Sequence, residues 1–243
     1  KRKIMNYALI FAGGTGTRMN SKTLPKQFLE LHGKPIIIYT LELFDAHPEI
    51  DGIVVVCLED YIPYLKQLLE KFRIEKVRAI VPGGKNGQES IWHGVKKLHE
   101  LCPDDSIILV HDGVRPLINE DTITENIACA KEHGNAITIC RAAETIVVQD
   151  DENSVVEIAD RPHSALARAP QTFRLGDLYR SHEKAIAEGR EDFIDSASLM
   201  RCYGATLHTV QGPVENIKIT TPSDFYIFRA SKDAQEDSQI FGL

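Results

Sequence analysis

A loop rich in glycine and in cationic side chains, FAGGTGTRMNSKTLPKQF at residues 11–28, follows the first apolar run of the sequence. Glycines allow backbone N–H groups to approach phosphate oxygens closely, and Arg18 and Lys26 add positive charge on long side chains. A loop of this chemistry suits a nucleoside triphosphate. A surface turn with solvated cations has the same composition, so the loop alone leaves both interpretations open.

Local charge and the failure of two other motifs favour a triphosphate. The chain has a net charge of −7, yet residues 15–34 contain four cations against one acid, Glu30. A dinucleotide site of the G-x-G-x-x-G type needs a small residue where Met19 stands and a helix directly after the loop, but residues 20–25 are typical of a turn. No Gly-Lys-Ser/Thr sequence closes a P-loop. A nicotinamide oxidoreductase is therefore disfavoured.

Two further motifs carry groups suited to phosphate chemistry. Asp112 follows the apolar run at 107–110, and open α/β sheets bind ligands at the carboxyl ends of their strands. A carboxylate there can hold Mg²⁺ against a triphosphate, although the motif alone is explained more simply by an Asp that braces the turn against Arg115. A second glycine loop, VPGGKNGQES at 81–90, follows another apolar run. Together these groups favour an enzyme over a module that only senses nucleotide.

The elements that must position these groups alternate between short β-branched runs and amphipathic stretches, as in a mostly parallel sheet covered by helices. We expect strands at 7–12, 52–58, 77–81, 107–111, 136–140, 205–210 and 216–220. Segments 145–148 and 155–158 flank a polar turn and predict a β-hairpin outside this alternation. The prediction is an α/β fold: a single Rossmann-like domain over residues 1–243, with a mostly parallel mixed sheet and a protruding hairpin arm at about 141–165.

Composition argues against several classes of protein. The five cysteines are far apart in the sequence and no histidine has metal-ligand spacing, so neither disulfides nor a zinc site is expected. The net charge of −7 opposes binding to nucleic acid and to anionic membranes. No apolar run is long enough to span a membrane and no signal-peptide pattern occurs, so we expect a cytoplasmic protein.

Several motifs in a fixed order resemble the cytidylyltransferases that join CTP to a polyol phosphate, over residues from about 7 to 228. The motifs are FAGGTGTRM at 11–19, PKQF at 25–28, GKP at 33–35, Gly83-Gly84 with Ser90, VHDGVRP at 110–116, APQTF at 169–173 and NIKIT at 216–220. This family has two close branches, which act on 2-C-methyl-D-erythritol 4-phosphate and on D-ribitol 5-phosphate. The resemblance implies an enzyme that attaches CMP to its substrate and releases pyrophosphate, with Mg²⁺ as the cofactor.

The resemblance also implies roles for individual residues. The residues expected to be catalytic are Arg18, Lys26 and Lys218. The residues expected to frame the nucleotide are Ala12, Gly13, Gly14, Thr15, Gly16, Gly83, Ser90, Asp112 and Gly113. Asp112 and Glu215 would hold Mg²⁺, although the family more often has Asp than Glu at the second position. Arg161 and Asp195 would bind the polyol phosphate, while Asp195 is also well placed to cap a helix.

Smaller features favour the ribitol branch. Gly113 and Val114 follow Asp112, where the erythritol branch typically has alanines. That branch also grips its polyol with two threonines at the positions of Ala169 and Ile194, and losing both hydroxyls would leave substrate groups unpaired. The expected product is therefore CDP-ribitol for teichoic acid or capsule, and the erythritol compound is the alternative substrate. The hairpin arm resembles the family's dimer arm, so a homodimer is expected.

Overall fold

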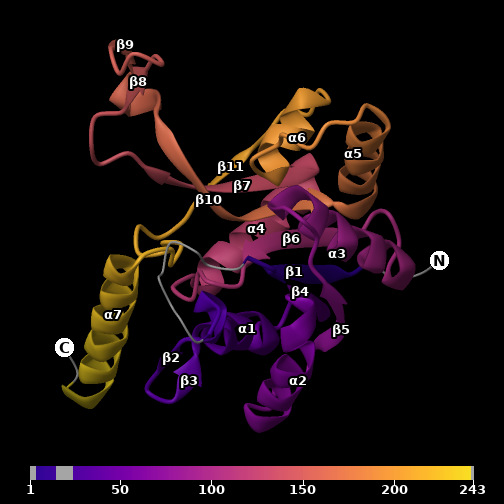
Figure 1. Cartoon of the computed structure of the whole chain (residues 1–243), viewed down its shortest axis with the longest axis vertical. Helices are drawn as coiled ribbons and strands as arrows, with labels where there is room; N and C mark the ends of the chain where they lie inside the picture. Colours follow the sequence, from indigo (N-terminus) through magenta and orange to yellow (C-terminus); the bar gives the residue numbers. More distant parts are fainter. Residues whose placement is uncertain (1–3, 15–23, 242–243) are drawn as a thin grey trace.

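The computed structural model describes residues 4–14 and 24–241 and has three layers, with helices on both faces of a central sheet (Figure 1). Within the described residues this sheet has seven strands in the order β11-β7-β10-β6-β1-β4-β5. They are β1 (Asn6–Ala12), β4 (Gly52–Cys57), β5 (Val77–Pro82), β6 (Ile107–Asp112), β7 (Asn135–Arg141), β10 (Ala165–Arg174) and β11 (Thr209–Gln211). The predicted α/β class is confirmed.

The directions of the strands bring several strand ends to one edge of the sheet. β1 pairs in parallel with β4 and β6, and β4 pairs in parallel with β5. β10 runs antiparallel between β6 and β7, which makes the sheet mixed. The carboxyl ends of β1, β4, β5 and β6 therefore share an edge with the amino end of β10. Open α/β sheets bind their ligands at this edge.

Helices cover both faces of the sheet because each carries an apolar stripe. One face is covered by α1 (Ile36–Ala46), α2 (Ile62–Lys71) and α4 (Glu120–His133). The other face is covered by α3 (Gly87–Leu101), α5 (Leu175–Ala187) and α6 (Ser196–Cys202). The starts of α3 and α4 are fixed by Asn86 and Asn119, whose side chains accept backbone N–H groups of the first turn.

One strand prediction was wrong, and one strand of the seven-stranded sheet was not predicted. Residues 216–220 are irregular, and the Ile219 N–H donates to the Val114 carbonyl instead of joining a strand ladder. The strand expected at 205–210 is shortened to β11. The missed strand is β10, which contains Pro170. Because proline has no N–H to donate, the strand is interrupted there, and its register against β7 shifts.

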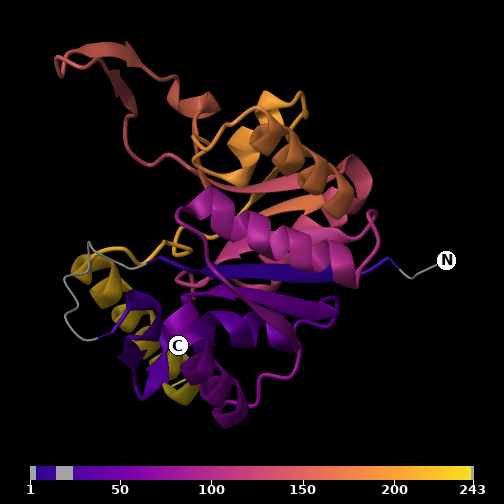
Figure 2. The same ribbon diagram turned by 45° about the vertical axis from the view of Figure 1, so that its right-hand side comes forward.

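The predicted hairpin arm is present and stands clear of the body in two views (Figures 1 and 2). Its strands β8 (Val147–Gln149) and β9 (Val155–Ile158) pair antiparallel. Asp150 closes the turn, since its Oδ1 accepts from two backbone N–H groups. The arm exposes apolar side chains, including Val156, which is 61% exposed. A projecting apolar surface of this kind is typical of a contact site.

Two apolar clusters hold the segment that follows the first glycine loop, the main core around Phe28 and a smaller cluster around Phe228. The elements here are a 3-10 helix (Lys26–Phe28), the short strands β2 (Glu30–Leu31) and β3 (Lys34–Pro35), and α7 (Pro222–Phe241). Phe28 is fully buried and stacks on Tyr61, with the ring centroids 5.2 Å apart. Phe228 of α7 is also fully buried and packs in a cluster with Leu31. These contacts hold Lys26 close to the ligand-binding edge of the sheet.

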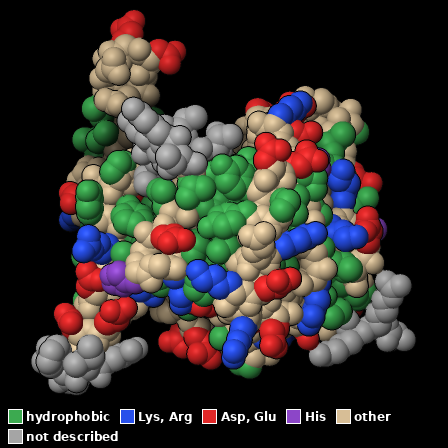
Figure 3. Space-filling model, turned by 60° about the horizontal axis from the view of Figure 1, so that its bottom comes forward, with side chains coloured by type: hydrophobic (Ala, Val, Ile, Leu, Met, Phe, Trp, Pro, Cys, Tyr) green, Lys and Arg blue, Asp and Glu red, His purple; other side chains and the backbone are tan. Residues whose placement is uncertain are grey.

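The surface combines charged and apolar regions. On the face drawn in Figure 3, basic and acidic side chains are interspersed, and hydrophobic side chains gather near the centre. In the described part of the chain, no helix is both long and apolar enough to cross a membrane. The five cysteines are free thiols: Cys57, Cys102 and Cys140 are buried, Cys129 is partly buried, and Cys202 is exposed.

Candidate active site

The two glycine loops meet at the carboxyl edge of the sheet. Gly13 and Gly83 lie so close that a Cβ atom on Gly83 would be 3.4 Å from the Cα of Gly13. Ser90 locks the second loop: its Oγ accepts from the Gly84 N–H at 3.0 Å and donates to the Asn86 carbonyl at 2.8 Å. A Cβ atom on Gly13 would lie 3.3 Å from the Ser90 Oγ, so a side chain there would crowd the contact between the loops.

Gln27 ties the first loop to the short helix that carries Lys26. Its side chain is 1% exposed. The Nε2 atom donates to the Ala12 carbonyl at 2.6 Å and to the Gly14 carbonyl at 3.3 Å. These bonds fix the backbone where β1 leaves the sheet. No role was predicted for Gln27, because the residues next to it in the sequence do not indicate that its polar side chain is buried.

A cavity of about 440 Å³, which we call the loop cavity, lies between the two loops. Residues of its wall that the sequence analysis had selected are Ala12, Gly13, Gly14, Lys26, Ser90, Asp112 and Lys218. The structure therefore brings together groups from five distant parts of the chain. Glycine backbone on one side and lysine ammonium groups on the other suit the phosphates of a nucleotide.

A second cavity of about 280 Å³, which we call the inner cavity, adjoins the loop cavity. The two cavities share Phe11, Gly87, Asp112 and Lys218. The rest of the inner wall comes mainly from α3, β10, α5 and the start of α6. Two ligands bound side by side in these cavities would both contact Asp112 and Lys218.

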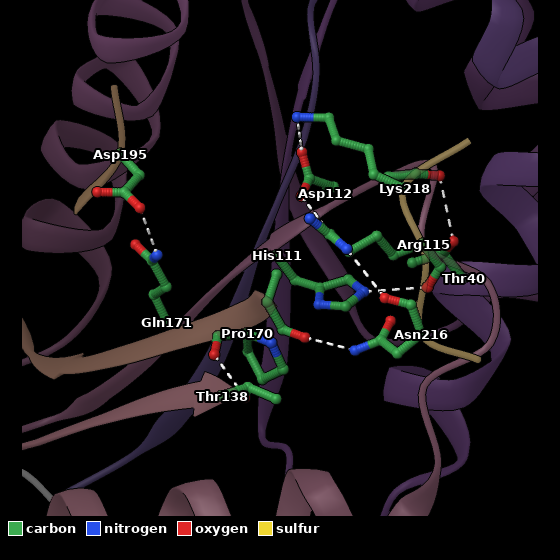
Figure 4. Close-up of polar contacts among 12 residues, drawn as sticks. Thr40, His111, Asp112, Arg115, Thr138, Pro170, Gln171, Asp195, Asn216 and Lys218 are labelled. Carbon is green, nitrogen blue, oxygen red and sulfur yellow. Dashed lines mark hydrogen bonds and ion pairs between the residues drawn. The ribbon is translucent and has the colours of Figure 1, made fainter. Parts of the chain in front are cut away.

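Asp112, Arg115 and Lys218 form a charge cluster where the cavities meet (Figure 4). The Asp112 side chain is 7% exposed; its Oδ2 accepts from Arg115 Nε at 2.7 Å, and its Oδ1 pairs with Lys218 Nζ at 2.5 Å. Arg115 also donates to the Asn216 carbonyl at 2.9 Å, and the Asn216 side chain donates to the Ala169 carbonyl at 2.7 Å. Asp112 thus braces the turn against Arg115 and lines both cavities as well.

The charge state of this cluster follows from its surroundings. Burial alone would raise the pKa of Asp112, but Lys218 and Arg115 hold it at about 2, so the carboxylate is ionised at neutral pH. His111 precedes it on β6, and complete burial lowers the pKa of this histidine to about 4. The neutral imidazole bonds the Arg115 carbonyl through Nε2 at 3.1 Å. His111 therefore adds no charge to the cluster.

Asp195 caps a helix and lines the inner cavity. Its Oδ1 accepts from the Ser198 N–H at 2.7 Å, which makes it the N-cap of α6, as predicted. Its Oδ2 accepts from Gln171 Nε2 at 2.8 Å (Figure 4). Because both oxygens are engaged within the protein, its role toward a polyol stays a prediction.

The remaining predicted site residues lie farther from the cavities. Arg161 is exposed at the base of the arm, and its Nη1 donates to the Ala143 carbonyl at 3.4 Å. Glu215 is exposed, and neither residue belongs to the described walls of the two cavities. Gly113 lies beneath the first loop, and its N–H donates to the Phe11 carbonyl at 3.0 Å. Thr15, Gly16 and Arg18 fall outside the described residues.

The donor set at Asp112 fits a magnesium ion that takes most of its ligands from a substrate. Within residues 4–14 and 24–241, no group of three or more His, Cys, Asp or Glu side chains is placed to hold a metal. Mg²⁺ usually needs only one or two protein carboxylates beside phosphate oxygens and water. The ionised Asp112 would supply one such ligand, with the Lys218 ammonium, now paired to its Oδ1, turned toward a phosphate. Glu215 lines neither cavity as described, and its role toward a metal stays a prediction.

The sequence analysis missed several residues of the inner wall. These are Gln88, Arg168, Gln171, His182 and Ser196. They come from α3, β10, α5 and α6, whose proximity only the folded chain creates. Gln171 could have been selected from the sequence, since it lies in the motif APQTF at 169–173, which contributes to the family resemblance.

Glycine loops, an ionised aspartate and lysines at the carboxyl edge of an open sheet define an α/β protein that binds nucleotides. Residues 6–231 match the family 2-C-methyl-D-erythritol 4-phosphate cytidylyltransferase (IspD). The chain belongs to this family, and it is a cytidylyltransferase.

Individual relatives agree with this assignment. The ribitol-5-phosphate cytidylyltransferase of Vibrio parahaemolyticus is 53% identical over 238 residues, which cover 98% of this chain and 100% of that protein. The 2-C-methyl-D-erythritol 4-phosphate cytidylyltransferase of Clostridium botulinum is 36% identical over 222 residues, 91% of this chain and 95% of that protein. Among solved structures, 4-diphosphocytidyl-2C-methyl-D-erythritol synthase from Anaerococcus prevotii superposes with a TM-score of 0.80 at 27% identity, covering 95% of this chain and 96% of that chain.

Proposed function

We propose that this protein transfers the CMP moiety of CTP to D-ribitol 5-phosphate, giving CDP-ribitol and pyrophosphate. The observation that carries the proposal is the pair of adjoining cavities that share Asp112 and Lys218. CTP in the loop cavity and a polyol phosphate in the inner cavity would place their reacting phosphates at this pair. High identity to a ribitol-5-phosphate cytidylyltransferase over almost the whole chain supports ribitol over the erythritol compound.

The reaction needs positioning and charge neutralisation more than proton transfer. A phosphate oxygen of the polyol phosphate attacks the α-phosphorus of CTP and forms a new P–O bond. The bond between the α-phosphorus and the bridging oxygen breaks, and pyrophosphate leaves with the electron pair. Because the second pKa of a phosphate monoester is about 6, the nucleophile is largely ionised at neutral pH and requires no general base. Correct alignment then supplies much of the rate.

Cationic side chains would neutralise the charge that develops on the leaving group. Lys218 stands where the cavities meet, so its ammonium suits the α-phosphate between the two substrates. Lys26 lines only the loop cavity and suits the β- and γ-phosphates. Arg18 belongs to the same loop and is proposed for the leaving pyrophosphate. Backbone groups of Gly13 and Gly14 complete the phosphate-facing wall.

Magnesium is part of the proposal. Bound Mg²⁺ would neutralise triphosphate oxygens and bring the α-phosphate within reach of the nucleophile. Asp112 is the protein ligand that fits this task, because it is ionised and lines both cavities. Omission of Mg²⁺ should therefore remove turnover without unfolding the protein.

The inner cavity also bears on the choice of polyol. Ala169 and Ile194 both line it and provide no hydroxyl group. An enzyme of the erythritol branch would use threonines at these positions, according to the resemblance of the sequence motifs. Their replacement by apolar residues supports a different polyol, and ribitol phosphate is the one we propose.

A homodimer formed through the arm is likewise proposed. Arg161 lies at the base of the arm, is exposed and lines neither cavity of its own chain, so we propose that it reaches the polyol phosphate in the cavity of a second subunit. The exposed valines of β8 and β9 suit burial against that subunit. Cytoplasmic location stays a prediction from the apolar pattern of the sequence, and a role of the product in teichoic acid or capsule synthesis stays a prediction of the resemblance.

Pyrophosphate release from CTP and Mg²⁺ tests the proposal, run in parallel with D-ribitol 5-phosphate and with 2-C-methyl-D-erythritol 4-phosphate. We expect release with the ribitol compound and a much lower kcat/KM with the erythritol compound. The reverse order would assign the chain to the other branch and show that threonine hydroxyls are dispensable at Ala169 and Ile194. A reaction without any polyol phosphate would indicate hydrolysis instead of transfer.

A further inference from the structure

The wall of the inner cavity contains buried polar atoms without a protein partner. His182 and Ser196 both line this cavity, and each is 2% exposed. Among the described residues, the two ring nitrogens of His182 and the Oγ of Ser196 have no hydrogen-bond partner. Buried polar atoms are nearly always paired, since leaving one unpaired is destabilising. The two side chains therefore point to a ligand group that this cavity receives.

Neighbouring polar side chains of the same wall are already satisfied. Gln88 donates to the Arg190 carbonyl at 2.9 Å and accepts from the Phe193 N–H at 3.2 Å. Gln171 donates to Asp195 at 2.8 Å and accepts from the Ala197 N–H at 2.9 Å. Intraprotein bonds thus position these amides. His182 and Ser196 differ from them in keeping hydrogen-bonding capacity for something else.

The chemistry of the two side chains matches a hydroxyl group. Burial lowers the pKa of His182 to about 4, so the imidazole is neutral and offers one donor and one acceptor. Its ring stacks on Trp92, with centroids 5.5 Å apart and planes 21° from parallel, which fixes its orientation. The Ser196 hydroxyl can also donate and accept. A ligand hydroxyl can donate to one such group and accept from another, whereas a phosphate would gain no charge from either.

We propose that His182 and Ser196 bind the terminal hydroxyl of the polyol phosphate, at the end of the chain opposite its phosphate. This inference rests on the proposed function and adds to it the residues that recognise the length of the polyol. The proposed function places the phosphate end at Lys218. Ser196 follows Asp195, which Figure 4 places apart from the pair of Asp112 and Lys218. In this orientation the five-carbon chain would carry its terminal hydroxyl one carbon farther toward that wall than a four-carbon chain.

The apolar residues of the same cavity strengthen the inference. Ala169 and Ile194 cannot hydrogen-bond a polyol, so its hydroxyls need other partners in the inner cavity. His182 and Ser196 provide unpaired atoms on α5 and at the start of α6. Neither lines the loop cavity, so their contribution should be confined to the polyol.

The test compares D-ribitol 5-phosphate with 1-deoxy-D-ribitol 5-phosphate, which lacks only the terminal hydroxyl. Wild type and the variants Ser196→Ala, Ser196→Thr and His182→Phe are assayed for pyrophosphate release with CTP and Mg²⁺. Ser181→Ala is the matched control, because Ser181 lies on α5, donates to the Asp177 carbonyl and does not line the inner cavity. Phenylalanine keeps a ring to stack on Trp92.

Wild type should prefer the hydroxylated substrate by about tenfold or more in kcat/KM, the effect of one good hydrogen bond. Ser196→Ala and His182→Phe should lose most of this preference, with KM for CTP unchanged, while Ser196→Thr and Ser181→Ala keep it. The same preference in all variants, or equal losses on both substrates, would overturn the inference and leave both side chains with a structural role. No turnover of D-ribitol 5-phosphate by wild type would instead refute the proposed function, and the inference with it.

Discussion

Replacing Asp112 with asparagine should destabilise the protein by about 3 kcal/mol. The Asp112 side chain is 7% exposed and its two oxygens pair with Arg115 and Lys218. Removing one member of a buried ion pair costs about 3–5 kcal/mol, because the other charge is left without compensation. The lower end of this energy range applies to Asp112→Asn. Lys218 is 38% exposed, so its ammonium regains water when the carboxylate is removed, and the cost comes mainly from Arg115, which is only 10% exposed.

The pH dependence of stability provides a second test of the same reasoning. Lys218 and Arg115 lower the pKa of Asp112 from 3.8 to about 2 against the effect of burial. A depressed folded-state pKa contributes stability that is complete above 3.8 and is lost as the pH falls toward 2. A shift of this size corresponds to about 2 kcal/mol. Asparagine takes up no proton. The difference in the free energy of unfolding between wild type and Asp112→Asn should therefore narrow as the pH falls from 3.8 toward 2.

Urea unfolding followed by the fluorescence of the single tryptophan, Trp92, measures both effects. Asp177→Asn is the control, because the pair of Asp177 and Arg180 is half exposed and should contribute less than about 1 kcal/mol. Turnover of Asp112→Asn should fall by about a hundredfold or more, beyond what unfolding explains. Two results would refute the electrostatic account of the cluster. One is a loss of stability in Asp112→Asn no larger than that in Asp177→Asn, and the other is a difference in unfolding free energy between wild type and Asp112→Asn that stays constant with pH.

Two further predictions follow from the loop cavity and the arm. Lys26→Ala should lower kcat/KM for CTP by about a hundredfold, because Lys26 lines the loop cavity. The urea midpoint should stay unchanged, because the buried ring of Phe28 holds this segment. Full activity of the variant would remove Lys26 from the site. Val156→Asp should shift the proposed dimer to monomer in sedimentation experiments while each chain stays folded, since Val156 is 61% exposed on the arm. An undisturbed dimer would exclude the arm from the interface.

Much of the fold was predictable because buried parallel strands appear as short apolar runs. β1, β4, β5 and β6 lie within one or two residues of their predicted ranges. β10 escaped prediction since its sequence, ALARAPQTFR, contains a proline and little regular alternation. The opposite error occurred at 216–220, where Ile217 and Ile219 alternate with polar residues as in a strand, but no neighbouring strand edge accepts them.

The candidate site was predictable in its parts. Glycines after β1 and β5, and a carboxylate at the end of β6, are local features whose chemistry can be judged without a structure. The sequence also suggested that Asp195 caps a helix, and it does. What could not be judged locally was Gln27, because its bonds to Ala12 and Gly14 are made across a turn that composition does not describe.

The sequence by itself therefore determined the types of element, the glycine loops and the position of Asp112 at a strand end, since each depends on neighbours a few residues away. Only the tertiary structure decided which side chains meet. Lys218 reaches Asp112 from a segment more than a hundred residues later, and both residues line the two cavities of the site. The unpaired atoms of His182 and Ser196 likewise became visible only when α5 and α6 packed beside β10. Periodicity reports whether a residue is buried, whereas the identity of its partners depends on how distant segments pack.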